Sequence, residues 1–467
     1  MGDFMIKDMF KKTYKTFIII ILTLSAIYLT GQLWFVEIAG RDIGYVMSSF
    51  FPNNRIDIED IRTGMLATPF RIIAGNEDNI YTIIYNNLDA SEQKRVADEL
   101  IFEVLTNGTF VSSFPIDYSE LLHGNVYIYE FAVRLPSDAF ARSFGLRSGI
   151  ISSRVDEFDK IVLKQNSIDR SAISVIIVNT DIGECFEFVY RDAALTALFN
   201  NSFDNISNSK HQITYISSVQ EGYTMFNTNV FIPVWEGDYF LYNMVIPENP
   251  YLENGLLHLN TIADRVSMFF DRPASKWSGL QNNVFTFSQG NTVVKYHPNN
   301  VLEYSYYGAL SQGASPSFES DFYIALNFIY RDAMVTGEFY LDAHRSNATQ
   351  SIFYFSYAIN DFPVKLSTII MSETGMSHAI EVTVENGIVR RYRKLAVSFN
   401  QETIIQGYAN ISFDDHIGLF AADYGDQRIL LDNVSLAYIL DRRNELPLHW
   451  FSIMEGTPHS QPARFRY

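Results

Sequence analysis

The stretch FIIIILTLSAIYLTGQLWFV, from Phe17 to Val36, is uncharged and almost entirely apolar. At about 1.5 Å of rise per helical residue it would reach roughly 30 Å, the thickness of a bilayer's hydrocarbon core. A signal peptide has a shorter apolar region and ends in small residues at a cleavage site, whereas this stretch ends in large ones. The sequence therefore predicts an uncleaved transmembrane helix over 17–36.

The charges on the two sides of this stretch predict its orientation. A cluster of lysines precedes it, and Glu37 follows it; the lysines are Lys7, Lys11, Lys12 and Lys15. Because positive residues flanking a span stay on the cytoplasmic side, residues 1–16 are expected to form a cytoplasmic tail. We expect a single-pass protein of the cell membrane with its bulk extracellular, joined to the anchor by a connector over 37–60.

One face of the predicted anchor carries small residues. Thr23, Ala26 and Thr30 follow one another at helical spacing, and Gln32 adds a polar side chain near the outer end. Small residues let a second helix approach closely in lipid, where association depends on packing and interhelical hydrogen bonds. These residues are our candidates for a partner-helix interface. The alternative is that they are ordinary residues of a membrane helix.

The composition excludes several classes of protein. The formal net charge of −18 argues against nucleic acid as a partner, because such proteins carry basic surfaces. A hydrophobic content of 47% is enough to build folded cores. The only cysteine is Cys185, so no disulfide within the chain is possible. The outer part must be stabilised by its cores alone.

Hydrophobic periodicity predicts three extracytoplasmic domains of the α+β class, mainly antiparallel sheet with packed helices. The first spans 61–200 and contains a helix near 90–105 and a buried strand from Ile173 to Asn179. A polar stretch from Asn200 to Lys210 suggests a boundary, and the second domain spans 201–310. The third spans 311–467 and ends in a polar C-terminal tail after Ile453.

A hairpin is predicted in the third domain over AIEVTVENGIVRRYRK, Ala379 to Lys394. Asn386 and Gly387 are the turn residues, with Gly387 left-handed at the end of a three-residue loop. This register sets Glu381 opposite Arg391 as an outward ion pair. We reject a two-residue loop because it would place arginines opposite apolar residues.

The sequence shows no motif for catalysis, for a cofactor or for a metal. The histidines are scattered, and no metal-ligand spacing, nucleophile motif or phosphate-binding loop occurs. Cys185 lies in an apolar strand, where a cysteine acts as a small hydrophobe. Two alternatives stay open: carboxylates meeting in a cleft as a glycan hydrolase, and an aromatic-lined site for an envelope ligand.

Several segments resemble the YycH family, accessory regulators of the cell-wall sensor histidine kinase of low-GC Gram-positive bacteria. The segments are ILTLSAIYLTGQLWF (21–35), ADRVSMFFDRP (263–273), VFTFSQGNTVVKYHPNNVLEYS (284–305), YFSYAINDFPV (354–364) and the hairpin of 379–394. The last two lie in the third domain, which is similar to the part that the family shares with its sister protein YycI.

The resemblance implies a membrane-anchored regulator rather than an enzyme. Proteins of this family bind the two-component sensor kinase largely through transmembrane helices, often together with YycI, and modulate its output. The resemblance implies no catalytic activity and no cofactor. The main hypothesis is therefore a regulatory protein of cell-wall metabolism, and the runner-up is a membrane-tethered hydrolase or envelope-ligand-binding module.

Overall fold

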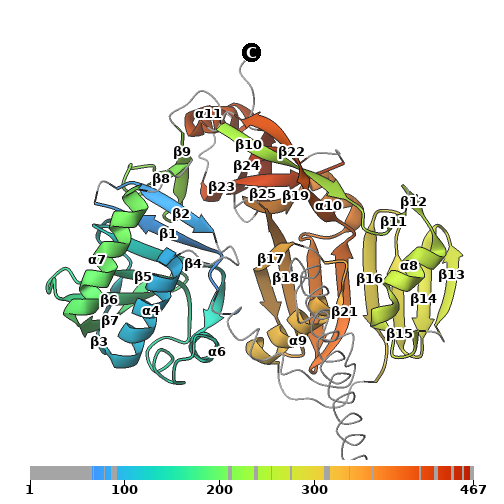
Figure 1. The fold of residues 1–467 in the computed structure, drawn as a ribbon, viewed down its shortest axis with the longest axis horizontal. Helices are drawn as coiled ribbons and strands as arrows, with labels where there is room; N and C mark the ends of the chain where they lie inside the picture. The colour runs from blue at the N-terminus through green and yellow to red at the C-terminus, as the bar shows by residue number, and fades with distance from the viewer. Residues whose placement is uncertain are drawn as a thin grey trace, which may run out of the picture. The chain divides into compact units, whose positions relative to one another are not determined.

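The computed structural model describes residues 66, 68–77, 79–85, 92–208, 213–235, 240–253, 255–273, 276–309, 316–335, 337–359, 362–409, 412–424, 430–442, 446–454 and 457–462. These residues belong to one compact unit built on two large sheets (Figure 1). The predicted tail, anchor and connector over 1–60 lie outside the described residues. None of the helices in the described ranges is long and apolar enough to cross a membrane.

The first sheet has nine strands in the order β3-β7-β6-β5-β4-β1-β2-β8-β9, and neighbouring strands are antiparallel. The strands are β1 (Arg71–Gly75), β2 (Tyr81–Tyr85), β3 (Thr109–Pro115), β4 (Val126–Pro136), β5 (Glu157–Gln165), β6 (Ala172–Asn179), β7 (Glu184–Arg191), β8 (Thr214–Ser217) and β9 (Phe231–Val234). Every residue of β6 is buried, as its apolar sequence predicts for an interior strand.

Helices cover both faces of the nine-stranded sheet. Helices α4 (Glu92–Asn107) and α7 (Ala193–Asn208) lie side by side on one face (Figure 1). The apolar stripe predicted for the first of them is confirmed, because Ala97, Leu100 and Val104 are fully buried. On the opposite face, the short α5 (Tyr118–Leu121) packs into a second core cluster. Helix α6 (Ser137–Ser143) follows β4 directly.

The second sheet has twelve strands in the order β13-β14-β15-β16-β21-β20-β18-β19-β23-β24-β25, with β17 paired to β18. The strands are β13 (Trp277–Gln281), β14 (Val284–Gln289), β15 (Thr292–Tyr296), β16 (Val301–Tyr306), β17 (Glu338–Ser346), β18 (Gln350–Ile359), β19 (Phe362–Leu366), β20 (Ile380–Glu385), β21 (Ile388–Leu395), β23 (Leu431–Leu440), β24 (Leu448–Met454) and β25 (Thr457–Pro462). The pair β19–β23 is parallel, and the other pairs are antiparallel. The mainly antiparallel α+β class is thus confirmed.

Smaller elements complete this half of the chain. Helix α9 (Phe318–Arg331) packs on β18, β20 and β21 through its apolar face, in which Phe322, Leu326 and Ile329 are buried. The other helical elements are α8 (Leu259–Arg265), η1 (Ser267–Phe269), α10 (Thr368–Thr374) and α11 (Phe413–Tyr424). Two small antiparallel sheets pair β10 (Phe240–Glu248) with β22 (Ser398–Ala409) and β11 (Leu252–Glu253) with β12 (Leu256–Leu257).

The boundary predicted at residue 200 falls inside a helix. Residues 200–208 of the polar stretch that we interpreted as a boundary form much of α7. Its asparagines and serines suggested a loop, but Phe199 and Phe203, four residues apart, are buried in the core of the first sheet. Tertiary burial of these rings outweighs the weak helix propensity of the polar residues between them.

The second predicted domain, 201–310, is divided between the two large sheets. Strands β8 and β9 extend the first sheet beyond β2, and the β-meander β13–β16 joins the second sheet where β16 pairs with β21. An edge strand leaves a row of unpaired backbone groups, and pairing across the predicted boundary satisfies them. Part of the predicted C-terminal tail likewise forms β25, paired with β24.

The hairpin of β20 and β21 turns through fewer residues than predicted. Glu385 pairs with Ile388, so the loop is the two residues Asn386 and Gly387, with φ of 51° and 75°. The predicted register was wrong. A β-bulge near Thr383 shifts the register by one residue, which keeps the buried apolar residues of the two strands on one face. Glu381 therefore faces Arg393 rather than Arg391, and their side chains form an ion pair of 3.1 Å.

Candidate functional site

A buried cluster of charges lies across three adjacent strands of the first sheet. The register of β1, β4 and β5 places Arg71 opposite Glu130, and Glu130 opposite Lys160. The Glu130 carboxylate accepts hydrogen bonds of 2.6 Å from both cations, from the Arg71 Nε and from the Lys160 Nζ. Its side chain is only 9% exposed. This triad is therefore fixed by sheet register rather than by a loop.

The two cations determine the protonation of Glu130. Burial alone would raise the pKa of its carboxyl, but the charges and hydrogen bonds of Arg71 and Lys160 hold that pKa at about 2. The pKa of Lys160 is raised, because the attraction of Glu130 outweighs the effect of burial. A carboxylate that stays ionised near pH 2 cannot act as a general acid at neutral pH.

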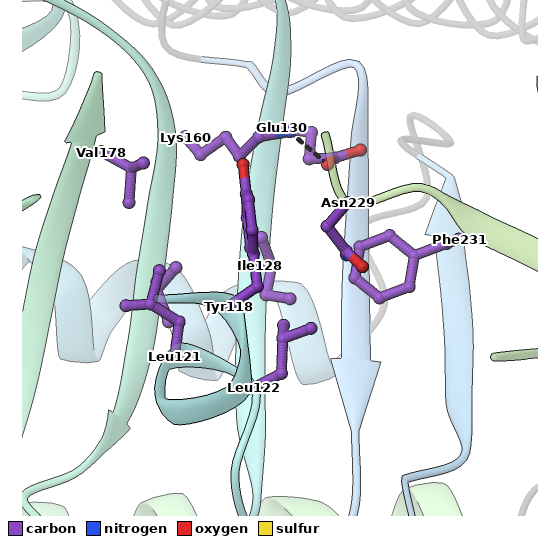
Figure 2. A pocket seen from close by; sticks show the side chains of 10 residues that line it. Tyr118, Leu121, Leu122, Ile128, Glu130, Lys160, Val178, Asn229 and Phe231 are labelled. Atoms are coloured by element: carbon purple, nitrogen blue, oxygen red, sulfur yellow. Dashed lines mark hydrogen bonds and ion pairs between the residues drawn. The ribbon is translucent and has the colours of Figure 1, made fainter. Parts of the chain in front are cut away.

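A small cavity lies beside this triad on the face covered by α5. Tyr118 and the leucines that follow it line one side, and Asn229 and Phe231 line the other (Figure 2). The Tyr118 hydroxyl lies 3.1 Å from the Thr228 Oγ1, which ties α5 to the segment before β9. The cavity has a volume of about 10 Å³. This is room for about one water molecule and not for a sugar or a peptide side chain.

A second buried pair fastens α9 to the twelve-stranded sheet. The Lys394 Nζ lies 2.7 Å from the Asp332 Oδ2, and the two side chains are 1% and 0% exposed. The Tyr392 hydroxyl donates to the same oxygen at 2.9 Å. Asp332 caps the C-terminus of α9, where a negative charge is unfavourable, and Lys394 compensates it. Burial lowers the pKa of Lys394, and the charge of Asp332 opposes this.

A third cluster surrounds Asp342, at an irregularity in the pairing of β17 with β18. Its Oδ2 lies 2.5 Å from the Lys365 Nζ and 3.6 Å from the His378 Nε2. The Ser356 hydroxyl donates to the same oxygen at 2.6 Å. Burial would raise the pKa of Asp342, but Lys365 and His378 lower it overall. Burial lowers the pKa of His378.

These carboxylates do not form a hydrolytic pair. Each of them is bound to a lysine; Glu130 lies in the first sheet, Asp342 in the second, and Asp332 at the C-terminal end of α9. Asp321 is also buried; desolvation raises its pKa, and its carboxylate accepts a hydrogen bond from Ser351. Among the described residues no cluster of histidines, cysteines or acids has the geometry to hold a metal.

Cys185 is buried in β7, as predicted for a small hydrophobe in a strand. Burial raises the pKa of its thiol to about 12. The thiolate is the nucleophilic form of cysteine, and a thiol with this pKa stays protonated at neutral pH. The side chain therefore packs in the core and offers no reactive sulfur.

The residues predicted from sequence fall into two groups. The partner-helix candidates Thr23, Ala26, Thr30 and Gln32 lie outside the described residues. The turn residues Asn386 and Gly387 do occupy a hairpin turn with positive φ, although the loop is shorter than predicted.

Sequence reasoning missed the three buried ion clusters. The signal was present in YIYEF, where Glu130 stands among apolar residues of a buried strand, and in KIVLK, which begins with Lys160. A charge inside an apolar strand demands a partner. Which partner it has depends on which strands pair, and one sequence does not give the order of strands in a sheet.

Comparison with known proteins supports one fold. No protein-family model matches the sequence, and no curated protein matches it. The crystal structure of YycH from Bacillus subtilis is similar, with a TM-score of 0.56 at 14% sequence identity, over 85% of this chain and 96% of that chain. An uncharacterized protein from Eubacterium rectale aligns with a TM-score of 0.32 at 10% identity, over 54% of this chain and 89% of that chain. A TM-score of this size does not indicate a shared fold, so nothing is argued from it. The chain therefore shares the fold of YycH.

Proposed function

We propose that this chain, which has a YycH-like fold, is a membrane-anchored regulator of a sensor histidine kinase. The observation that carries the proposal is the likeness of fold to YycH over 85% of the chain. The sequence resemblance to the same family, found independently in the anchor, the meander and the third-domain hairpin, supports it. Modulation of a two-component system that controls cell-wall metabolism is the role that this resemblance implies.

In this proposal the chain binds the kinase through its transmembrane helix. The face formed by Thr23, Ala26 and Thr30 offers a surface for close helix packing, and Gln32 offers a polar contact. A YycI-like sister protein is the second proposed partner. The N-terminus lies in the cytoplasm and the folded part outside, so protease added to intact protoplasts should degrade the folded part. Full protection would contradict this topology.

The hydrolase alternative gains no support from the described residues. A glycosidase needs two carboxyl groups about 5–10 Å apart across a cleft that admits a sugar. The cavity beside Glu130 has a volume of about 10 Å³, and the carboxylate there is bound to two cations. The buried acids Glu130, Asp332 and Asp342 are each bound to a lysine. We therefore propose no enzymatic activity.

The experiment that tests the proposal is copurification of the tagged full-length chain from detergent-solubilised membranes, with the partners identified by mass spectrometry. We expect a histidine kinase and a second single-span protein among the specific partners. A matched control is the same folded part fused to an unrelated transmembrane helix, which should lose the kinase. Recovery of cell-wall glycan fragments with no kinase would overturn the proposal.

A further inference from the structure

The two large sheets meet at Phe70, the residue immediately before β1. Its backbone N–H donates to the Glu130 carbonyl at 2.8 Å, which fixes it to the first sheet. Its ring lies 4.6 Å from the ring of Tyr340, which belongs to β17 of the twelve-stranded sheet. Strand β17 also runs beside β4. The ring pair therefore connects elements of different sheets.

A cation lies near each ring of this pair. The Arg71 guanidinium is 5.8 Å from the centre of the Phe70 ring, and the Lys365 ammonium is 5.7 Å from the centre of the Tyr340 ring. Each cation is held by an acid of its own sheet, Arg71 by Glu130 and Lys365 by Asp342. The ion clusters around Glu130 and Asp342 therefore each place one cation at this contact between the sheets.

A second side-chain contact joins the same two bodies. Arg142 on α6 donates from its Nε to the Glu319 Oε2 at 2.9 Å, and Glu319 lies in the first turn of α9. The Arg142 side chain is 49% exposed. An ion pair at this exposure contributes little to stability, because water screens the two charges. Beside it, Phe318 packs against the core of the first sheet.

The third contact is made by backbone groups. The Asn227 N–H donates to the Leu431 carbonyl at 3.1 Å, and the Leu431 N–H donates to the Met225 carbonyl at 2.7 Å. The Asn227 side chain also donates to Asp432 at 2.8 Å. Backbone hydrogen bonds are short-ranged and directional, whereas a tilted ring pair and an exposed ion pair can separate and re-form. In the inference below, the backbone contact at Leu431 serves as the pivot, and the Phe70–Tyr340 ring pair and the Arg142–Glu319 ion pair serve as the latch.

The latch lies where the chain enters the fold. Leu66 is 3% exposed in a core cluster that both sheets share, and Phe70 follows it after a few residues. Everything N-terminal to this point leads to the predicted anchor. We infer that the Phe70–Tyr340 latch couples the relative orientation of the two sheets to the membrane anchor. This inference rests on the proposed function and adds to it the element that transmits regulation.

The test measures the orientation of the sheets directly. Spin labels are attached at I168C, in the β5–β6 turn, and I369C, on α10, in the full-length chain in lipid nanodiscs; the parent side chains are 95% and 52% exposed. Cys185 is buried and stays unlabelled. We expect one narrow distribution of distances in the parent and a broader distribution with a second maximum in Tyr340→Leu. The matched control is Tyr190→Leu, whose half-buried ring lies in β7 and packs against the core of the first sheet, and which should leave the distribution unchanged.

Expression of a kinase-dependent gene provides the second readout. Tyr340→Leu should change the expression of this gene while the kinase still copurifies. Phe70→Leu, which removes the other ring, should have the same effect. A distance distribution unchanged in both variants would overturn the latch. A broadened distribution with unchanged expression of the gene would overturn the coupling. The proposed function would still stand in that case if A26L/T30L, which alters the predicted partner-helix face of the anchor, changes the expression. If the anchor variants also leave expression unchanged, the proposed function itself fails.

Discussion

Lys394 is one of the most deeply buried charged residues among those described. It is an ammonium with a 1% exposed side chain, and its compensation comes from Asp332. Removing one member of such a pair leaves the other buried and uncompensated, which costs about 3–5 kcal/mol. The sheet therefore tolerates a lysine on its inner face only because α9 ends in an acid.

Lys394→Met is expected to lower the free energy of unfolding by about 3 kcal/mol, since it leaves Asp332 without its cation. Urea denaturation of the folded unit, residues 62–467, measures this. The double variant Lys394→Met/Asp332→Asn removes both charges and should recover a large share of the loss. Equal stability of the parent and the single variant would show that the pair does not form.

Glu130 makes folding stability depend on pH. Its folded-state pKa of about 2 lies below the ordinary value of 4.5, so between these values the unfolded chain binds more protons than the folded chain. The stabilisation is complete above about pH 4.5 and is lost as the pH falls toward 2. By linkage it amounts to about 3 kcal/mol at neutral pH.

Glu130→Gln should therefore unfold more easily at pH 7 and show a smaller loss of stability on acidification. Urea midpoints measured at intervals from pH 7 to pH 3 test this, with the exposed Glu184→Gln as the control. A variant whose midpoint falls with pH as steeply as that of the parent would mean that Glu130 is not the group responsible.

At the scale of elements, the hairpin of β20 and β21 depends on two residues with positive φ. Gly387 has φ of 75°, and a Cβ built there would meet only the Ile324 side chain, at 3.9 Å. Any cost of substitution therefore comes from the backbone conformation and not from a clash. Positive φ is unfavourable for β-branched residues and is tolerated by asparagine.

Gly387→Val is expected to destabilise the chain by roughly 1 kcal/mol or more, and Gly387→Asn by much less, because asparagine adopts the left-handed region readily. Thermal melts of the two variants beside the parent make the comparison. If valine and asparagine had the same effect, the strain would not lie at this φ.

Periodic elements could be predicted from the sequence, and pairings could not. Helices α4 and α9 and strand β6 follow from apolar spacing, because each buries one stripe or both faces. Helix α7 was missed because its buried rings stand among asparagines and serines. The hairpin register was wrong because a bulge, which has no sequence signal of its own, restored the inward face.

The same limit applies to the candidate site. Glu130 was visible as a charge in an apolar strand, but its partner Arg71 lies 59 residues away in the sequence. Lys394 stands among the arginines of β21, and its partner Asp332 lies on a different element. Whether two such segments come together depends on the order of the strands in the sheet. That order in turn depends on which strand edges would otherwise be left unpaired.

For the whole molecule, the two large sheets share a core cluster that runs from Tyr81 and Val126 to Val434 and Trp450. The three predicted outer domains thus become two sheets that pack against each other. A folded part of this kind suits a regulator whose output depends on orientation. Under the proposed function, a change in orientation would pass through the latch and the anchor.

The central claim is that this chain regulates a sensor kinase through its anchor. In lipid, helix association depends on close packing, so A26L/T30L should hold a partner helix away while keeping the segment apolar. Conservative leucine changes on the other face, I20L/I27L, are the matched control. The measurement is detergent-resistant copurification of the kinase with each full-length variant. We expect A26L/T30L to lose most of the kinase and I20L/I27L to retain it. Equal recovery of the kinase with both variants would contradict the claim.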